Sequence, residues 1–278
     1  MARVMVTGGT GVLGRAVVPR LLADGHQVTV LTRRPAAQVP GGACPVAGDL
    51  ARGDGLDAAV TGAEVVVHLA TQPFRPARVD VVGTKTLIDV IRRCGGGPHL
   101  VYVSIVGVDQ IPWPYYKRKR QAEVLVAGSG LPYTIQRATQ FHDLVLMAMA
   151  SAARAPFLVV PAGTSGQPVD VADVAERLTQ IVRSGPVSGF GADLGGPQVL
   201  DAADLARDVL SALGIRRPVR PVRIPGRVGA GFRAGHHLAA GTPRGGLTWR
   251  GYLEDRCTAE PGVLRLPYTG RRVPIRRQ

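Results

Sequence analysis

The sequence predicts an α/β fold in which a doubly wound parallel sheet is followed by a smaller C-terminal part. The first observation is that short β-branched or apolar runs alternate with segments of helical spacing over residues 1–140. This alternation is typical of parallel strands joined by right-handed helical crossovers. The second observation is a glycine-rich segment, residues 7–14, between the first expected strand and the first expected helix.

The expected elements follow from the spacing of apolar residues. Strands are expected at residues 3–7, 27–32, 44–47, 64–70, 99–104 and 133–137. Helices are expected between them at residues 12–23, 56–60, 79–93 and 116–126. Two later helices, 171–182 and 201–213, each start at an aspartate suited to capping, Asp170 and Asp201. Residues 215–247 are rich in Gly, Pro and Arg and are expected to be irregular.

The glycine-rich segment TGGTGVLG carries the strongest functional signal. Its spaced glycines allow a tight turn at Gly8, a close approach of a ligand at Gly11, and close helix packing at Gly14. Because the next helix begins with free N–H groups, its N-terminus favours the pyrophosphate of a dinucleotide. The sequence therefore predicts a Rossmann-type domain whose cofactor contacts Gly8, Thr10, Gly11, Val12, Leu13 and Gly14.

The end of the second expected strand favours one cofactor over another. Arg33 and Arg34 stand where an enzyme that prefers NAD usually has an acidic residue for the ribose hydroxyls. Two guanidinium groups suit a 2′-phosphate, so the predicted cofactor is NADP(H). The alternative is a pair of surface arginines in an arginine-rich chain. Topology alone places further cofactor contacts after the third and fourth strands, at Asp49, Leu50, Ala70, Thr71 and Gln72.

Three parts are expected along the chain. Residues 1–140 form the NAD(P)-binding domain, residues 141–255 a smaller mixed substrate-binding part that can return a strand to the sheet, and residues 256–278 a basic tail. The net charge of +14 is concentrated at the end, because residues 216–278 contain fourteen arginines and three acidic residues. Such a segment can bind nucleic acid or an acidic partner. Since no DNA-binding motif accompanies it, we expect a solvated segment and no nucleic-acid or membrane partner.

The three cysteines, Cys44, Cys94 and Cys257, lie far apart and suggest neither a disulfide framework nor a metal site. The paired His236 and His237 lack acidic or cysteine companions, so no metal site is expected there either. The longest apolar stretch, residues 144–153, is too short to span a bilayer. These features predict a cytoplasmic protein that is a monomer or a homodimer and acts on a small molecule.

Several motifs resemble the short-chain dehydrogenase/reductase superfamily: TGGTGVLG, GDL at 48–50, HLAT at 68–71, VDVVGTKTLID at 79–89 and HLVYVSIVG at 99–107. LPYTIQRATQFHD at 131–143 and QPVDVADVA at 167–175 are similar to the atypical, NmrA-like branch of NAD(P)-binding proteins, related to isoflavone-reductase-type enzymes. The resemblance extends over residues 1–255.

The resemblance implies a catalytic set of Ser104, Tyr115 and Lys119. A tyrosine has a reference pKa of about 10, and a nearby ammonium stabilises its phenolate. Residues four apart share a helix face, so Lys119 is expected to lower the pKa of Tyr115. Tyr115 would then protonate a substrate oxygen to which Ser104 donates a hydrogen bond. Nearby prolines leave open whether Tyr115 lies in the first turn of the helix, and Tyr116 is its rival.

The remaining candidates follow the sixth strand or surround the catalytic set. Arg137 and Thr139 are expected beside the nicotinamide. Phe74, Trp113, Phe141 and His142 are expected to line a substrate pocket. Core packing explains the aromatic residues almost as well, and a lone histidine is more often structural.

Three functions fit these observations. The leading one is an NADPH-dependent reductase of a small organic carbonyl or enone, in which Tyr115 donates the proton. The second is a non-catalytic NADP sensor that regulates another protein. The third is a non-redox enzyme on the same fold, an isomerase or cyclase of secondary metabolism, because fold alone does not separate these classes.

Overall fold

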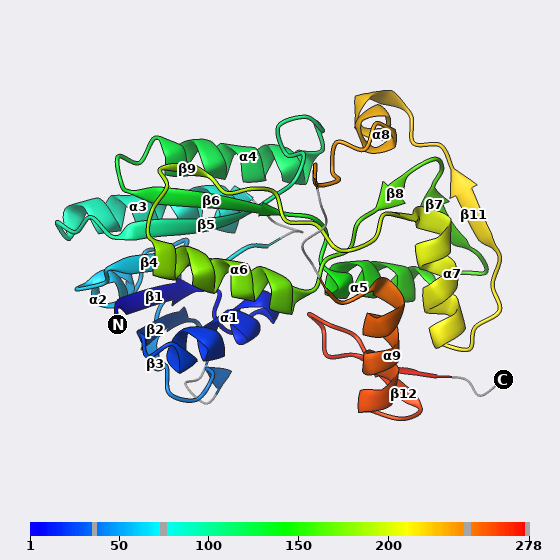
Figure 1. Cartoon of the computed structure of the whole chain (residues 1–278), viewed down its shortest axis with the longest axis horizontal. Coiled ribbons are helices and arrows are strands. Elements are labelled where there is room, and N and C mark those ends of the chain that lie inside the picture. Colours follow the sequence, from blue (N-terminus) through cyan, green and yellow to red (C-terminus); the bar gives the residue numbers. More distant parts are fainter. Residues whose placement is uncertain (35–37, 73–76, 242–245, 276–278) are drawn as a thin grey trace. The chain divides into compact units, whose positions relative to one another are not determined.

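The chain divides into two compact units, each with its own core (Figure 1). The structure is a computed structural model that describes residues 1–34, 38–72, 77–241 and 246–275. The first unit comprises Met1–Asp109, Trp113–Arg137 and Val174–Ala192. The second unit comprises Gln110–Pro112, Ala138–Asp173 and Asp193–Gln278. The chain thus returns to the first unit after residue 173, and the expected functional division at residue 140 stays a prediction.

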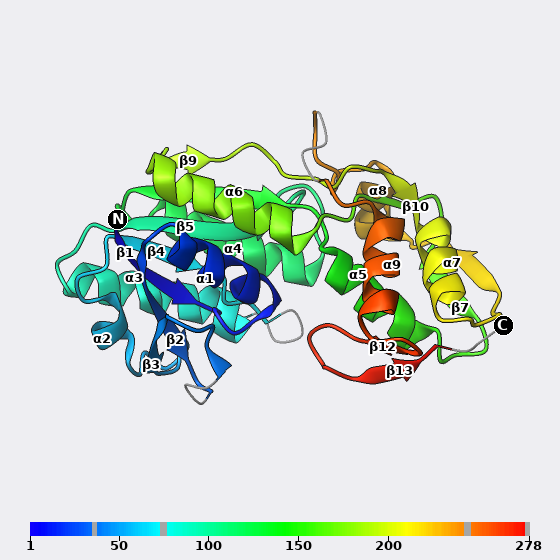
Figure 2. The ribbon, with the colours of Figure 1, turned by 60° about the horizontal axis from the view of Figure 1, so that its bottom comes forward.

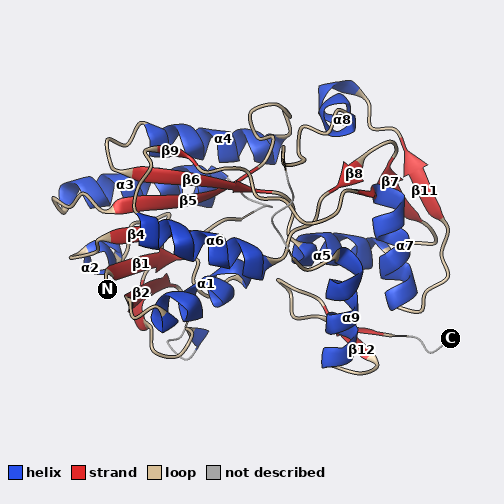
Figure 3. Ribbon diagram, viewed as in Figure 1, coloured by secondary structure: helices blue, strands red, loops and turns tan. Residues whose placement is uncertain are grey.

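The first unit contains a seven-stranded parallel sheet of order β3-β2-β1-β4-β5-β6-β9 (Figure 3). The strands are β1 (Arg3–Thr7), β2 (Gln27–Thr32), β3 (Cys44–Ala47), β4 (Val65–His68), β5 (His99–Ile105), β6 (Tyr133–Ala138) and β9 (Gly189–Phe190). The order reverses at β1, which pairs with both β2 and β4. This confirms the predicted doubly wound α/β fold, and ligands of such sheets bind beyond the carboxyl ends of the strands near the reversal.

Helices cover both faces of this sheet. They are α1 (Val12–Ala23), α2 (Leu56–Val60), α3 (Thr84–Arg93), α4 (Pro114–Ala127) and α6 (Val171–Ser184). One apolar core joins strand residues such as Met5 and Leu100 to Leu56 of α2, Leu87 of α3 and Val126 of α4. Helices α1 and α6 lie side by side (Figure 2), and an ion pair between Asp24 and Arg183 links their C-terminal ends.

Two elements near the expected site differ in detail from the sequence prediction. The helix expected at 79–93 is a π-helix, η2 (Ala77–Gly83), followed by α3. Such wide turns occur mostly inside α-helices and often at functional sites. Helix α4 begins at Pro114, because proline is well suited to the first position of a helix. Tyr115 therefore lies in the first turn of α4, which resolves the alternative left open by the sequence.

In its described residues, the second unit has small sheets and four helices. Its strands pair two by two: β7 (Leu158–Pro161) with β11 (Val219–Val222), β8 (Ser165–Gly166) with β10 (Leu200–Asp201), and β12 (Val263–Arg265) with β13 (Arg272–Pro274). The helices are α5 (His142–Ala152), α7 (Ala202–Ala212), α8 (Gly226–Arg233) and α9 (Trp249–Ala259). Their core includes Leu146, Val209, Trp249 and Leu253.

Two expectations about this unit need correction. Residues 215–247 are not wholly irregular, since they contain β11 and α8. The C-terminal segment is basic but is not a detached solvated tail, because Leu264 and Leu266 are buried in the core of the second unit. The expected caps are present: the carboxylates of Asp170 and Asp201 accept hydrogen bonds from the backbone N–H groups of Ala172 and Ala203.

Candidate functional site

The glycine loop after β1 has a shape that only glycine allows. Gly8 has a φ of +72°, and a Cβ there would lie 2.8 Å from the backbone nitrogen of Ala70. A Cβ on Gly14 would overlap the carbonyl oxygen of Gly8 and lie 2.5 Å from the Cα of Gly9. The loop is closed by a hydrogen bond of 2.9 Å from the Gly11 N–H to the Gly8 oxygen. The backbone is therefore held close to the start of α1, with no side chain in the way.

The N-terminus of α1 fits an anionic ligand. No described side chain caps it, so its first N–H groups are left for another acceptor. The helix dipole favours negative charge at this end, and the absence of Cβ atoms lets a phosphate approach the backbone. Gly11, Val12 and Leu13 stand at this terminus, with Thr10 just before it. The residues present thus fit the pyrophosphate of a dinucleotide.

Arg33 and Arg34 follow β2 and are both exposed. The guanidinium of Arg33 lies 3.8 Å from the carboxylate of Asp49, and its side chain is 73% exposed. The Asp49 carboxylate itself accepts hydrogen bonds from the N–H groups of Ala51 and Arg52, which hold the turn after β3. Leu50 is buried in the core of the unit. Both arginines therefore remain accessible to a ligand, whereas Asp49 and Leu50 have evident structural roles.

The buried side chain of His68 connects Thr7, at the start of the glycine loop, with Thr84 of helix α3. The ring of His68, at the end of β4, lies 2.6 Å from the Thr7 hydroxyl and 2.9 Å from the Thr84 hydroxyl. The Thr84 hydroxyl donates to the backbone oxygen of Asp80, so it accepts from Nε2–H of His68. Burial, helped by the charge of Lys119, lowers the pKa of His68 to about 3. The ring is therefore neutral and acts as a fixed hydrogen-bond bridge.

Asp80 is the centre of a polar network, the Asp80 network, that also contains Thr71, Gln72, Tyr115 and Lys119. Its role was not predicted from the sequence. Its side chain is fully buried on η2, and its carboxylate accepts hydrogen bonds from the Thr71 hydroxyl (2.7 Å) and the Gln72 N–H (3.1 Å). Lys119 Nζ lies 3.6 Å from the same carboxylate. One signal in the sequence could have revealed it: Asp80 stands inside the apolar run VDVVG. A charged side chain is buried in a helix only when it is paired.

Lys119 is held inside the first unit and not against Tyr115. Its side chain is 4% exposed, and its ammonium donates a hydrogen bond of 2.7 Å to the backbone oxygen of Val103. The same ammonium stands 4.3 Å from the centre of the Tyr102 ring. Burial lowers the pKa of Lys119, and the carboxylates of Asp80 and Glu123 oppose that effect.

Tyr115 reaches the network through Thr71. Its phenol oxygen lies 3.0 Å from the Thr71 hydroxyl, which already gives its proton to Asp80 and therefore accepts from Tyr115. Burial raises the pKa of Tyr115, and the nearby Asp80 carboxylate raises it further. The expected lowering of this pKa by Lys119 is wrong for this arrangement, because the ammonium is paired with Asp80.

Ser104 and Trp113 are further candidates that the sequence predicted near Tyr115. Ser104 lies near the end of β5, is buried, and has a hydroxyl without a hydrogen-bond partner among the described residues. Such a hydroxyl can bind a ligand oxygen. Trp113 precedes α4, and its ring stands edge-on to Tyr115 with centroids 6.1 Å apart. Phe74, the other substrate candidate near this part of the sequence, lies outside the described residues.

Arg137 has protein partners where a cofactor contact was expected. Two of its nitrogens bond the Glu123 carboxylate at 2.8 Å, and the third lies 3.1 Å from Asp109. These carboxylates raise the pKa of Arg137 above its ordinary value, although burial opposes them. The guanidinium also packs on the ring of Phe190. This cluster fastens α4 to β6 and commits all three nitrogens of Arg137 to the protein.

The last three candidates belong to the second unit. The hydroxyl of Thr139 donates to the backbone oxygen of Gln167, and the backbone of Phe141 bridges to Val169. His142 is fully buried between Trp249 and Tyr252, with ring centroids 5.7 and 4.8 Å away. Its burial contradicts the expectation that it faces a substrate, because neighbouring aromatic rings cover it.

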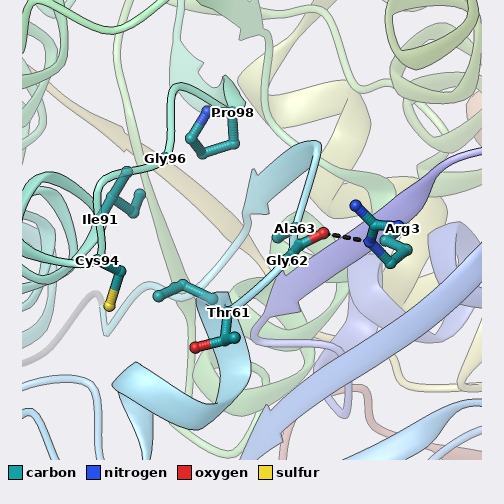
Figure 4. A pocket seen from close by; sticks show the side chains of 9 residues that line it. Arg3, Thr61, Gly62, Ala63, Ile91, Cys94, Gly96 and Pro98 are labelled. Carbon is teal, nitrogen blue, oxygen red and sulfur yellow. Dashed lines mark hydrogen bonds between the residues drawn. The ribbon is translucent and has the colours of Figure 1, made fainter.

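A pocket in the first unit lies at the amino ends of the sheet strands, opposite the ends that carry the glycine loop (Figure 4). Arg3 starts β1, Ala63 precedes β4 and Pro98 precedes β5, so these lining residues mark the amino ends of the strands. Ligands of doubly wound sheets bind at the carboxyl ends. The pocket is therefore separate from the glycine loop and the Asp80 network.

The sheet order, the glycine loop and the polar strand ends define a dinucleotide-binding protein of the Rossmann class. A family model described as NAD(P)H-binding matches residues 8–184. The chain belongs to this NAD(P)H-binding family, in the NmrA-like, atypical short-chain dehydrogenase/reductase group whose motifs it resembles.

Known proteins are similar over different extents. An uncharacterized protein of Mycobacterium tuberculosis is 30% identical over 232 residues, which are 80% of this chain and 24% of that protein. The chain thus spans about a quarter of that relative's length. The (4-alkanoyl-5-oxo-2,5-dihydrofuran-3-yl)methyl phosphate reductase of Streptomyces griseus is 28% identical over 226 residues, 78% of this chain and 75% of the reductase.

A solved structure of similar fold is the NADPH-dependent quinone oxidoreductase of Escherichia coli in complex with NADPH. The two share 18% sequence identity with a TM-score of 0.74, over 91% of this chain and 99% of that one. This likeness supports the fold. Within the described residues, no helix is both long and apolar enough to cross a membrane. The same residues contain no group of three or more metal-ligating side chains.

Proposed function

We propose that this protein is an NADPH-dependent oxidoreductase that reduces a small organic carbonyl or enone, with Tyr115 as the proton donor. The observation that carries the proposal is the chain of contacts from Tyr115 through Thr71 to the buried Asp80–Lys119 pair. This chain lies in the same unit as the glycine loop, at the carboxyl ends of β1, β4 and β5. The names of the Streptomyces reductase and the Escherichia quinone oxidoreductase support the reaction class.

The residues of the first unit have separate roles in this proposal. A reduced nicotinamide, when bound, supplies a hydride to the substrate carbon. Tyr115 donates its phenolic proton to the oxygen that gains charge, and the Ser104 hydroxyl donates a hydrogen bond to the same oxygen. At neutral pH the phenol of Tyr115 holds its proton, but its raised pKa makes it a weaker acid than a free tyrosine, so the transfer depends on the negative charge that develops on the substrate oxygen. Asp80 and Thr71 act as positioning residues, because they fix the phenol without touching the substrate.

The preference for NADPH rests on Arg33 and Arg34. Both are exposed at the end of β2, and the Arg33–Asp49 pair is long and solvent-exposed on the arginine side, so it costs little to break. A double Arg33→Ala, Arg34→Ala variant is expected to raise the KM for NADPH by on the order of 10-fold or more, through lost charge-assisted contacts. The KM for NADH serves as the control and should stay unchanged. An equal rise for both cofactors would contradict the assignment.

The direct test measures NADPH oxidation with a panel of quinones, ketones and enones. Tyr115→Phe is expected to lower kcat by about 100-fold or more, since general acid catalysis contributes factors of that size. Tyr116→Phe is the matched control, because it removes the same hydroxyl from the neighbouring buried tyrosine and should keep most of the activity. If Tyr115→Phe turned over like the parent, the proposed role of Tyr115 would be lost.

A second candidate, a non-catalytic NADP sensor, is favoured by one observation. Lys119 is paired with Asp80 and Val103 and leaves the Tyr115 phenol without an activating ammonium. The same assay separates the two functions. NADPH binding is measured by the change in nicotinamide fluorescence. Tight binding, with no oxidation of NADPH by any compound of the panel, would favour the sensor.

A further inference from the structure

The two-stranded sheet that β7 and β11 form in the second unit has one covered face and one open face. Leu158 and Val160 of β7 are buried in the core with residues of α7. The intervening Val159 is 51% exposed, and Val222 of β11 is 50% exposed. Phe157, just before β7, is 47% exposed. Since β7 and β11 pair side by side (Figure 3), these residues form an apolar strip on the open face.

Exposed arginines flank the two strands in the chain. Arg220 is paired in register with Val159. Arg154 comes before β7, Arg216 and Arg217 come before β11, and Arg223 and Arg227 follow it. The full set is Arg154, Arg216, Arg217, Arg220, Arg223 and Arg227, all of them exposed. Residues 216–227 contain five arginines and no acidic residue. We call the apolar strip with these six arginines the arginine-rimmed face.

These arginines lack partners, unlike others in the same unit. Within the described residues, none of the six arginine side chains makes a hydrogen bond, an ion pair or a ring contact. Arg207, Arg250 and Arg272 each pair with an acidic side chain at 2.5–3.1 Å. Clustered charges of one sign repel each other. A flat surface of opposite charge would remove that repulsion.

The free edge of β11 is unsuited to strand addition by a peptide. The backbone oxygens of Pro218 and Val222 accept hydrogen bonds from β7, so the intervening Pro221 faces the free edge. Proline has no N–H to donate there, and proline and charge at an edge are devices that block pairing. Binding at this place therefore depends on side chains and not on the backbone ladder.

We propose that the arginine-rimmed face docks the second unit onto an anionic lipid surface. Its charges are all positive, as a plane of lipid phosphates requires, and its apolar side chains can enter the boundary between headgroups and acyl chains. Nucleic acid fits less well, because single strands are bound by stacking on several aromatic rings and this face has only Phe157. The inference is independent of the proposed reductase activity and replaces the expectation of no membrane partner.

The test is co-sedimentation of the full chain with lipid vesicles. Vesicles of phosphatidylcholine with about one third phosphatidylglycerol are expected to bind the protein at low salt, and pure phosphatidylcholine vesicles are not. The triple variant Arg217→Gln, Arg220→Gln, Arg223→Gln should lose on the order of 100-fold in partition coefficient, about fivefold for each charge. The control triple variant Arg207→Gln, Arg250→Gln, Arg272→Gln removes equal charge and should bind as the parent does.

A double variant of exposed apolar residues tests whether the bound surface is lipid or another polyanion. Val222→Ser with Ile224→Ser is expected to weaken vesicle binding several-fold, because both side chains are exposed beside the arginines. The proposal is overturned if the parent does not sediment with anionic vesicles, or if the control triple variant loses as much binding as the test variant. It is also overturned if a DNA oligonucleotide releases the protein from the vesicles when the concentration of DNA phosphate is far below that of the lipid phosphate.

Discussion

Two buried polar centres, the Asp80 network of the first unit and His142 of the second, are held in different ways. In the first unit, Asp80, His68 and Lys119 bond to one another or to backbone and hydroxyl groups, and the network reaches Tyr115. In the second unit, both ring nitrogens of His142 are buried without a hydrogen bond among the described residues. Fully bonded buried groups fix one another and can orient a reacting side chain. The difference favours the first unit for the proposed site, whereas His142, whose Nδ1 lies 3.7 Å from the Asp170 carboxylate, packs beside Trp249 and Tyr252.

Removal of the Asp80 carboxylate is expected to have the largest effect on stability. Asp80→Ala leaves the buried ammonium of Lys119 without its carboxylate, which is expected to cost about 3–5 kcal/mol of the free energy of unfolding. Asp89→Asn is the control, since the exposed Lys85–Asp89 pair should contribute less than about 1 kcal/mol. Urea unfolding followed by circular dichroism measures both. A loss for Asp80→Ala no greater than for the control would mean that the network is not a structural unit.

The buried, neutral His68 makes the stability of the protein depend on pH. Its folded pKa of about 3 lies below the ordinary value of 6.5, so the unfolded chain binds the proton more readily. The contribution of His68 to stability is complete above pH 6.5 and is lost as the pH falls toward 3. Its slope approaches about 1.4 kcal/mol per pH unit within that window.

The His68→Gln variant isolates this contribution from that of other acid-sensitive groups. Between about pH 6 and pH 4, the free energy of unfolding should depend less steeply on pH in the variant. The difference in slope should be roughly the contribution of one bound proton. His99, whose pKa burial lowers to about 4, stays in both proteins and keeps a common background. Identical slopes in parent and variant would show that His68 is not held neutral.

The smallest effect is expected at His142. His142→Phe removes two desolvated nitrogens and keeps a ring between Trp249 and Tyr252, so the unfolding free energy should change by about 1 kcal/mol or less. NADPH oxidation should be unchanged. A large loss of turnover with unchanged stability would return His142 to the catalytic candidates.

The sequence predicted the parts of this molecule that depend on local pattern. Strands β1 to β6, helices α1, α2, α4 and α6, the glycine loop and the Asp201 cap each follow from residue spacing or from a backbone conformation that few residues allow, whereas β9 and the π-helix η2 were not predicted. The Asp80 network was beyond such reasoning, since its members come from β4, η2 and α4 and meet only after folding. The pairing of Arg137 with Glu123 was likewise hidden, because nothing in the chain's local pattern shows which carboxylate a guanidinium will reach.

The π-helix η2 has a consequence for how this protein can change. A π turn has one residue more than an α turn, and one residue of an α-helix corresponds to about 100° of rotation. Deletion of a single residue between Ala77 and Gly83 would restore a regular helix and turn Asp80 away from Thr71 and Lys119. The length of this segment is therefore under a stricter constraint than its composition, and an insertion or deletion there would remove the network in one step.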